Sequence, residues 1–385
     1  MKKKVLSVML AAVLATAMAA CGSSADSGAA AASSAAKEAP AEEAPAEEEA
    51  PAEEEKEAPA EEAPAEEEAP AEEEAPAAEG NDSTDFTIAT VVKLTGVAWF
   101  DRMEVGVNQF AEDTGVDAFQ TGANTADPAA QVAVIEDMIA QGVDAICIVP
   151  NSTESVETVI QKARDAGIVV ITHEASDVQN ADYDIEAFDN ASYGAHFMDQ
   201  LGPMMGGEGQ YTTYVGSLTA TSHNEWVDAS TEKQAAEYPD MELVSNKNET
   251  TEDSDIAYTK TKELLQAYPD LKGFQGSAMT DAPGVARAIE EAGRQDDTYV
   301  IGTSLVSVAG QYLETGAIDS ISFWDPALAG YAMNELALMI LQGKTPEDGM
   351  SLQAEGYQNL QLIGKVFYGK AWIDVTVDNM GDYDF

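Results

Sequence analysis

The apolar positions of residues 86–172 follow two periods, and each change of period marks a change of secondary structure. Short runs rich in valine, isoleucine and threonine predict buried strands, whereas apolar residues three and four apart predict amphipathic helices. Glycines after the helical stretches are typical of helix C-terminal caps. The predicted strands are Phe86–Val92, Val116–Thr121, Ala145–Pro150 and Ile168–Thr172, and the predicted helices are Phe100–Thr114, Pro128–Gln141 and Ser155–Ala166.

A second series of the same kind begins near Tyr211. Alternating strands and helices with short turns indicate parallel sheets with right-handed crossovers. Two consecutive series therefore predict an α/β protein with two Rossmann-like lobes. The second series comprises predicted strands at Tyr211–Val215, Met241–Ser245, Gly273–Ala278, Tyr299–Gly302 and Ser320–Phe323, predicted helices at Asn224–Tyr238, Ile256–Tyr268, Pro283–Gly293 and Leu328–Leu341, and an alternating tail at Lys365–Val377.

The segment after the first predicted strand places a cation close to two aromatic rings. Lys93 directly follows the strand, and Trp99 and Phe100 precede the first helical stripe. Because ligands bind at the carboxyl ends of the strands of an open parallel sheet, these three residues predict part of a recognition site. The alternative is that Trp99 and Phe100 only cover the core of the first helix.

The N-terminus predicts export and lipid anchoring. Met1–Ala20 has three lysines before a short apolar run, which is typical of a signal peptide rather than a membrane span. Ala17–Cys21 resembles a bacterial lipobox, with Met18 where leucine is usual, so Cys21 is expected to carry the lipid. Residues 21–83 contain repeated Ala-Pro-Ala-Glu-Glu units, whose prolines and like charges predict an extended acidic tether.

The charge of the chain excludes two classes of function. The formal net charge is −51, and residues 81–385 contain 50 acidic and 14 basic residues. Binding to nucleic acid needs a basic face, and so does docking on an anionic membrane surface. Cys147 is the only cysteine besides Cys21, so no disulfide framework is expected.

The sequence shows no recognisable catalytic or metal-binding motif. It lacks G-x-S-x-G, the phosphate-binding G-x-x-x-x-G-K-[ST], H-E-x-x-H and C-x-x-C. Its histidines, His173, His196 and His223, are scattered, so neither a metal site nor a cofactor is expected. His173 and His223 are either binding groups or solvated loop residues. The chain is therefore expected not to be an enzyme.

As binding groups, the same positions suit a small ligand that carries hydroxyl groups. Charged side chains make strong hydrogen bonds to hydroxyls, and flat aromatic faces cover C–H surfaces in an enclosed pocket. Trp99 and Trp324 fall at predicted strand ends. Trp226 is either a core residue or a site residue, and Trp372 is expected to pack in a strand.

The sequence resembles type I periplasmic (solute-) binding proteins of sugar ABC importers, nearest the autoinducer-2-binding and rhamnose-binding branch. The resemblance covers residues 85–385 and depends on the order and spacing of several segments. They include K-L-T-G-V-A-W-F (93–100), Q-G-V-D-A-I-C-I-V-P (141–150), T-A-T-S-H-N-E-W (219–226) and S-F-W-D-P (322–326).

The resemblance implies two lobes that are discontinuous in sequence, joined by three hinge crossings. Lobe one would comprise 84–188 and 325–352, and lobe two 189–324 and 353–385. Glu174 stands where relatives commonly have aspartate, although Glu174 and Asp325 would alternatively be exposed acids. The ligand contacts implied by the resemblance are Lys93, Trp99, Phe100, Glu174, His223, Asn224, Met279, Asp281, Ser304, Trp324 and Asp325.

The function that the resemblance implies is capture of a small sugar or polyol for an ABC permease and ATPase complex. The protein would be a monomer at the cell surface or in the periplasm, attached to the membrane through its lipid only. The alternatives are an autoinducer-2-binding protein or a sugar-sensing receptor for chemotaxis or signalling. The autoinducer-2 receptor pattern matches at Lys93 but departs at Ser222, His223 and Glu174, so an ordinary sugar is expected to bind better.

Overall fold

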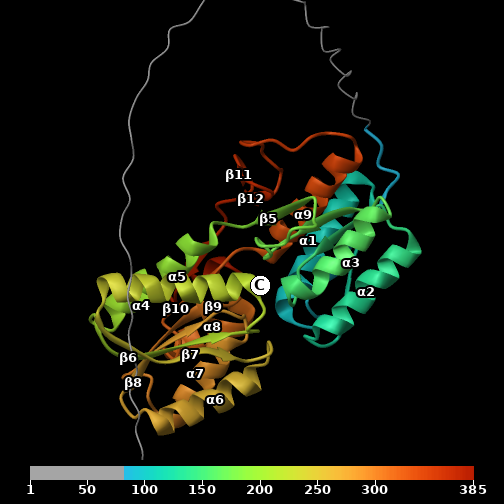
Figure 1. Ribbon diagram of the computed structural model, residues 1–385. Coiled ribbons are helices and arrows are strands. Elements are labelled where there is room, and N and C mark those ends of the chain that lie inside the picture. The colour runs from blue at the N-terminus through green and yellow to red at the C-terminus, as the bar shows by residue number, and fades with distance from the viewer. Residues whose placement is uncertain (1–81) are drawn as a thin grey trace, which may run out of the picture. The chain divides into compact units, whose positions relative to one another are not determined.

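The structure, a computed structural model, describes residues 82–385. The predicted signal peptide, Cys21 and nearly all of the predicted tether lie outside the described residues. Within residues 82–385, the strands form two separate sheets, each flanked by helices (Figure 1). The predicted α/β architecture with two lobes is therefore confirmed.

The first sheet has seven strands in the order β11-β12-β5-β4-β3-β1-β2 within the described chain. All neighbours are parallel except β11 and β12, which pair antiparallel. The strands are β1 (Thr87–Val92), β2 (Asp117–Gly122), β3 (Ala145–Ile148), β4 (Val169–Thr172), β5 (Tyr183–Glu186), β11 (Gln361–Ile363) and β12 (Val366–Tyr368).

Both faces of this sheet are covered, which explains its nearly continuous apolar strands. One face packs against α2 and α3, where Val91 and Ile148 meet Ile135 and Val156. The other face packs against α1 and α9 (Figure 1). The helices are α1 (Ala98–Thr114), α2 (Pro128–Gln141), α3 (Thr153–Asp165) and α9 (Pro326–Leu341).

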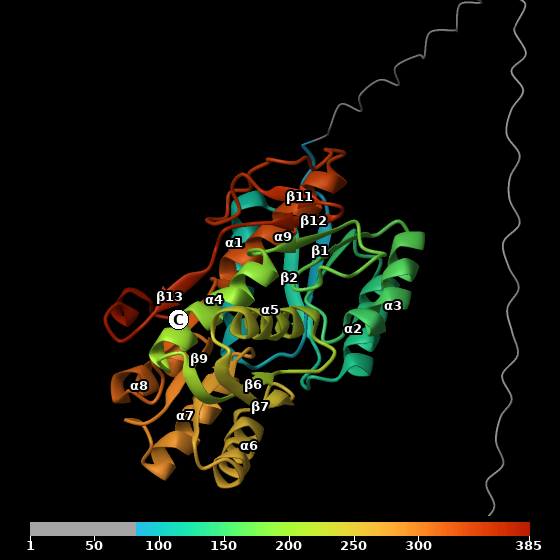
Figure 2. The same cartoon turned by 60° about the vertical axis from the view of Figure 1, so that its left-hand side comes forward.

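The second sheet has six strands in the order β13-β10-β9-β8-β6-β7 within residues 82–385. Only β13 is antiparallel to its neighbour. Helices α4 and α5 lie on one side of this sheet, and α6 and α7 lie on the other (Figures 1 and 2). The elements are β6 (Glu208–Val215), β7 (Asp240–Glu249), β8 (Leu271–Gly276), β9 (Tyr299–Thr303), β10 (Ser320–Phe323), β13 (Ile373–Val375), α4 (Asn190–Met204), α5 (Thr221–Glu237), α6 (Ser254–Ala267), α7 (Asp281–Ala292), α8 (Val306–Thr315) and the 3₁₀ helix η1 (Met380–Asp382).

Three connections join the two sheets in the described chain, as expected for the hinge. They run from β5 to α4, from β10 to α9 and from β12 to β13. Two of them are hydrogen-bonded to each other, because the N–H groups of Gly369 and Ala371 donate to the carbonyls of Glu186 and Ala187. The hinge is thus a short two-stranded ribbon beside a third crossing.

One predicted lobe boundary is wrong. Residues 353–385 were expected to belong wholly to lobe two, but β11 and β12 belong to the first sheet through pairing of β12 with β5. The chain crosses to the second sheet only between Tyr368 and Ile373. Both strands are three residues long, too short for an alternating pattern to indicate which sheet they join.

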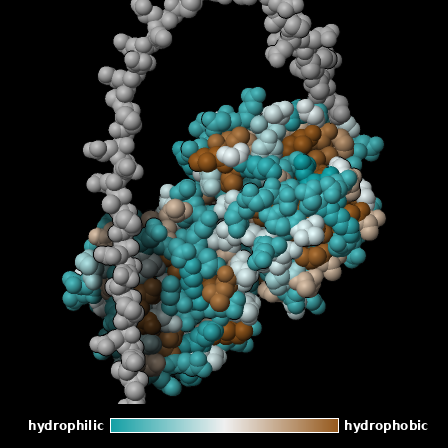
Figure 3. Space-filling model, viewed as in Figure 1, coloured by the Kyte–Doolittle hydropathy of each residue, from teal (hydrophilic) through white to brown (hydrophobic). Residues whose placement is uncertain are grey.

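The surface of the described chain is predominantly polar. Figure 3 shows a mainly hydrophilic face on which hydrophobic residues form scattered groups. Cys147 lies fully buried in β3 as a free thiol. No helix in residues 82–385 is both long enough and apolar enough to cross a bilayer.

Candidate ligand-binding site

A cavity lies where strand ends of both sheets meet. It contains about 410 Å³ of empty space, including space open to solvent. Residues that follow β1 and β4 contribute to it from the first sheet, and residues that follow β7 and β8 contribute from the second. The cavity is lined by Lys93, Val97, Trp99, Phe100, Glu174, His223, Trp226, Glu252, Ser277, Met279, Thr280, Thr303 and Trp324.

Two helices that carry lining residues begin earlier than predicted. Helix α1 begins at Ala98, so Trp99 and Phe100 belong to its first turn. Helix α5 begins at Thr221, so His223 is helical as well. Neither helix has a side-chain cap at its N-terminus, so the capping signal that would mark these starts in the sequence is missing.

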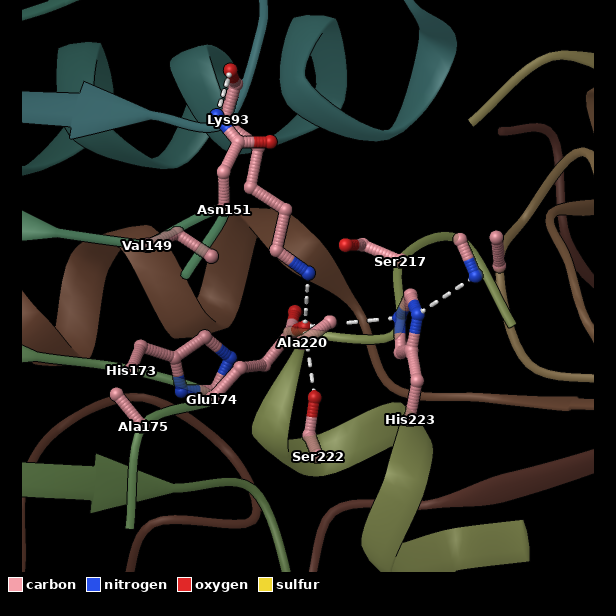
Figure 4. Close-up of polar contacts among 12 residues, drawn as sticks. Lys93, Val149, Asn151, His173, Glu174, Ala175, Ser217, Ala220, Ser222 and His223 are labelled. Carbon is pink, nitrogen blue, oxygen red and sulfur yellow. Dashed lines mark hydrogen bonds and ion pairs between the residues drawn. The ribbon is translucent and has the colours of Figure 1, made fainter. Parts of the chain in front are cut away.

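A buried ion pair forms the centre of the cavity. The Nζ atom of Lys93 lies 2.6 Å from Oε2 of Glu174, and both side chains are about 95% buried (Figure 4). Ser222, from the second lobe, donates its hydroxyl to the same oxygen at 3.2 Å. The backbone under Lys93 is also fixed, because Asn151 donates its amide to the Lys93 carbonyl at 2.8 Å. Lys93 and Glu174, which the sequence suggested only as separate ligand contacts, are therefore paired with each other in the structure.

The backbone and the charge of Glu174 both indicate a specialised position. Its φ is +57°, a left-handed conformation that is uncommon for residues with a side chain. Burial raises the pKa of its carboxyl, but the charge and hydrogen bond of Lys93 outweigh burial and lower the pKa from 4.5 to about 2. Glu174 is consequently ionised at neutral pH, and Lys93 neutralises it.

The two buried histidines beside Glu174 are held neutral. His223 accepts a hydrogen bond from the Gly216 N–H at Nδ1, which leaves the proton on Nε2, 4.0 Å from Glu174. Burial, reinforced by Lys93, lowers the pKa of His223 to about 3. His173 accepts from the Trp324 indole at 3.2 Å, and burial lowers its pKa too.

Aromatic rings form the apolar wall of the cavity. The rings of Trp99 and Trp324 meet edge to face, with centroids 4.7 Å apart. Trp226 lies 5.8 Å from Trp324, and its indole N–H donates to Asn190. Trp226, for which the sequence left two alternatives, is both fully buried and part of the lining. Trp99 and Phe100 likewise cover the helix core and line the cavity.

The second lobe contributes further polar groups besides the predicted contacts Met279 and Asp281. Ser277 and Thr280 place buried hydroxyl oxygens at the cavity, and neither has a hydrogen-bond partner among the described residues. These residues and Thr303 lie at or just after the ends of β8 and β9, where strand-end reasoning could have found them. Glu252 gave no comparable signal.

Four predicted site residues do not line the cavity. Asn224 donates to the carbonyls of Ser217 and Ala220 and fixes the loop before α5. Ser304 donates to the Met279 carbonyl, and Asp281 accepts from the N–H groups of Ser277 and Ala278 and from Thr250. Asp325 caps α9 and forms two hydrogen bonds with Arg102. These four residues hold the loops and helix ends around the cavity in place.

Polar contacts between the lobes continue beside the cavity. Thr221 contacts Thr153 at 3.1 Å and donates to Asp177 at 2.9 Å. Ser176 donates to Glu225 at 3.1 Å. Hydroxyl groups therefore make most of this contact, which is typical of surfaces that separate and meet again rather than of a permanent core.

The cavity is suited to binding rather than to catalysis. It presents donors and acceptors next to flat rings, which is what an enclosed site for a small polar molecule needs. The histidines are neutral and already hydrogen-bonded, and the acid is paired with a cation. No group of His, Cys, Asp and Glu side chains in residues 82–385 is arranged to hold a metal ion.

Two α/β lobes, a hinge of three chain crossings and a cavity between facing strand ends define a two-lobed ligand-binding protein. The chain belongs to the periplasmic binding protein family, whose domain matches residues 88–345. Because this is a family of binding proteins, the expected non-enzymatic role is confirmed.

Individual relatives agree with this assignment. The chain is 26% identical over 275 residues to the D-ribose/D-allose-binding protein of Pseudomonas aeruginosa, covering 68% of this chain and 83% of the relative. It is 25% identical over 284 residues to the ribose import binding protein of Bacillus subtilis, covering 72% and 88%. Among solved structures, LsrB from Clostridium saccharobutylicum in complex with AI-2 superposes with a TM-score of 0.72 at 22% identity, covering 78% of this chain and 100% of that one.

Proposed function

We propose that this protein is the extracytoplasmic substrate-binding component of an ABC importer and captures a small sugar or polyol between its lobes. The observation that carries the proposal is the cavity itself, which is lined by the Lys93–Glu174 pair, by unpartnered hydroxyls of the second lobe and by the rings of Trp99 and Trp324. Charge-assisted hydrogen bonds and aromatic faces are the two contacts that a sugar ring uses best.

The relatives support the sugar class of ligand. The names of two relatives state ribose or allose binding, and one of these names states import. A further solved structure of the same fold, from Clostridium phytofermentas, has bound L-rhamnose. Lipidation of Cys21, which lies outside the described residues, would hold the protein at the membrane beside its permease.

Autoinducer-2 is the second candidate ligand, because the Lys93 position matches the receptor pattern and LsrB shares the fold. The acid at the strand end is glutamate here, and it is already held by Lys93 and Ser222. A site built around one arrangement of hydroxyls rejects others, because each unmatched buried polar group costs about 1–3 kcal/mol. We therefore expect a pentose, deoxyhexose or hexose to bind better than autoinducer-2.

Calorimetry of the purified protein with D-ribose, D-allose, D-xylose, L-rhamnose and autoinducer-2 tests the proposal. We expect one sugar to bind with a stoichiometry of about one, to change tryptophan fluorescence and to be recovered unaltered. Trp99→Ala should weaken binding about tenfold or more by removing a ring face.

Trp372→Ala is the matched control, since Trp372 stacks on His196 and does not line the cavity. Its affinity for the sugar should stay close to that of the unmodified protein. Recovery of a chemically changed ligand would show an enzyme instead. Submicromolar binding of autoinducer-2 with no sugar bound would support the second candidate.

A further inference from the structure

The carboxylate of Glu252 lies at the cavity without a hydrogen-bond or ion-pair partner among the described residues. Glu252 belongs to the loop between β7 and α6 and is one of the lining residues. Among the described residues, no hydrogen bond or ion pair engages its carboxylate. Burying a carboxylate costs free energy unless a hydrogen-bond donor or a cation binds it, so we expect this carboxylate to contact the ligand.

The local backbone holds Glu252 in this position. Thr251 and Glu252 are consecutive left-handed residues, with φ of +51° and +58°. Gly216 leaves the space that the carboxylate occupies, because a Cβ at residue 216 would lie 2.3 Å from Oε1 of Glu252 and 3.1 Å from Cε1 of His223. Strained backbone of this kind clusters at functional sites, and here it places the Glu252 side chain at the cavity.

The cavity contains no cation that is free to balance Glu252. Lys93 is the only lysine or arginine among the lining residues, and it is paired with Glu174 at 2.6 Å. His223, whose pKa is lowered to about 3 by burial, is neutral. Burial raises the pKa of Glu252, and the charge of Lys93, which is already paired with Glu174, offsets this only in part.

Two unpartnered hydroxyls lie in the neighbouring loop. Ser277 is 1% exposed, and its Oγ has no partner in the described residues; the same holds for Oγ1 of Thr280. The two loops are tied together, because Thr250 donates to Asp281 at 2.7 Å and Asp281 accepts from the Ser277 N–H. The second lobe thus presents one anionic acceptor with two neutral hydroxyls on joined loops.

The net negative charge of the chain also favours a positively charged ligand. The 50 acidic residues of positions 81–385 outnumber the 14 basic ones, so the field around the protein attracts cations and repels anions. Neutral sugars gain nothing from this field. A ligand with one positive charge gains both from the field and from Glu252.

We propose that the ligand of this cavity is a small polyhydroxylated amine, such as an amino sugar, whose ammonium group binds Glu252 while its hydroxyls bind Ser277 and Thr280. This inference rests on the proposed function and narrows its ligand class. The ammonium group donates to the carboxylate, and no proton or bond needs to move.

Calorimetry with matched pairs tests the proposal at neutral pH. The pairs are D-glucosamine with D-glucose, D-galactosamine with D-galactose, and glucamine with sorbitol. In at least one pair, we expect the amine to bind about tenfold or more tightly than its neutral partner, because a charge-assisted hydrogen bond is about twice as strong as a neutral one. Glu252→Gln should abolish that preference, because the affinity for the amine falls to about that for its neutral partner in the same variant.

Asp253→Asn is the matched control. Asp253 is exposed, caps α6 through the N–H groups of Asp255 and Ile256, and does not line the cavity. The substitution removes one negative charge from the same loop, and asparagine caps helices equally well. We expect it to keep the amine preference. Gly216→Ala gives a second variant, since its Cβ would displace the Glu252 carboxylate and lower amine affinity while Glu252 remains present.

The outcomes separate the inference from the proposed function. Neutral sugars that bind as tightly as their amines, with no effect of Glu252→Gln, would overturn the inference and leave the proposed function standing. An amine preference lost equally in Asp253→Asn would also overturn it, because the long-range field and not contact with Glu252 would then be responsible. Absence of binding by every member of the three pairs and by the neutral sugars named above would overturn both.

Discussion

Removal of the Lys93 charge should destabilise the folded protein strongly, because it leaves Glu174 buried without its cation. The pKa of Glu174 is lowered from 4.5 to about 2 in the folded protein, and each pKa unit corresponds to about 1.36 kcal/mol. The ionised carboxylate is therefore worth about 3 kcal/mol to stability, which lies in the range of about 3–5 kcal/mol for breaking a buried pair. We expect Lys93→Met to cost that amount at pH 7.

Urea denaturation followed by tryptophan fluorescence measures this cost, since Trp99, Trp226 and Trp324 are all buried. The matched control is the double variant Lys93→Met with Glu174→Gln, which removes both charges. It should recover most of the lost stability, because a neutral amide needs no counter-charge.

The pH dependence gives an independent check with a definite sign. In the unmodified protein the folded pKa of Glu174 is depressed, so its contribution is complete above about pH 4.5 and is lost only as the pH falls toward about 2. In Lys93→Met, burial is the largest effect on the pKa of Glu174 and is opposed only by the weaker effects of His173 and His223. The pKa therefore rises, so stability should increase as the pH falls from 7 to 5. A cost below about 1 kcal/mol at pH 7, or a double variant as unstable as the single one, would refute the buried-pair reasoning.

Two further predictions concern the loop behind the cavity and the N-terminus. Burial raises the pKa of Asp281 from 3.8 to about 7, so the contribution of its protonated carboxyl to stability is present below about pH 3.8 and is lost as the pH rises through 7. Asp281→Asn should therefore be less stable than the unmodified protein at pH 5. Urea titrations should show that this difference in stability narrows by pH 8. If the difference in stability between Asp281→Asn and the unmodified protein widened as the pH rises, the raised pKa of Asp281 would be contradicted. Cys21→Ala should release the protein from membranes because the proposed acceptor of the lipid is lost, and continued labelling by a fatty-acid probe would exclude this cysteine as the anchor.

Much of the fold could be predicted because several elements carry their own signals. Helix α2 occupies the predicted range Pro128–Gln141, where Asp127 caps the first turn, proline begins the helix and Gly142 ends it with φ of +73°. Strand β5 was missed because it contains two acids, Asp184 and Glu186, at positions that are buried. Thr172 donates to one and the Ala175 N–H donates to the other, and only the tertiary structure supplies these partners.

The site was predictable to the extent that strand ends could be found. Lys93 and Glu174 follow β1 and β4, whose apolar runs are clear, and the structure brings them into contact. Asp325 also lies next to a strand end, but its carboxylate is used by Arg102 and by the cap of α9. Sequence position gives the neighbourhood of a side chain, whereas its competing partners decide whether it faces a ligand.

Glu252 shows why the rest of the site could not be predicted from the sequence. The alternation of β7 indicated a strand that ends at Ser245, but the observed strand continues to Glu249. Its pairing with β6 shifts register between Tyr211 and Tyr214, and such bulges break the two-residue period that marks a strand. The true strand end, and with it the acid, therefore lies beyond the predicted one. That acid faces the cavity only because two residues adopt positive φ and residue 216, remote in sequence, has no side chain.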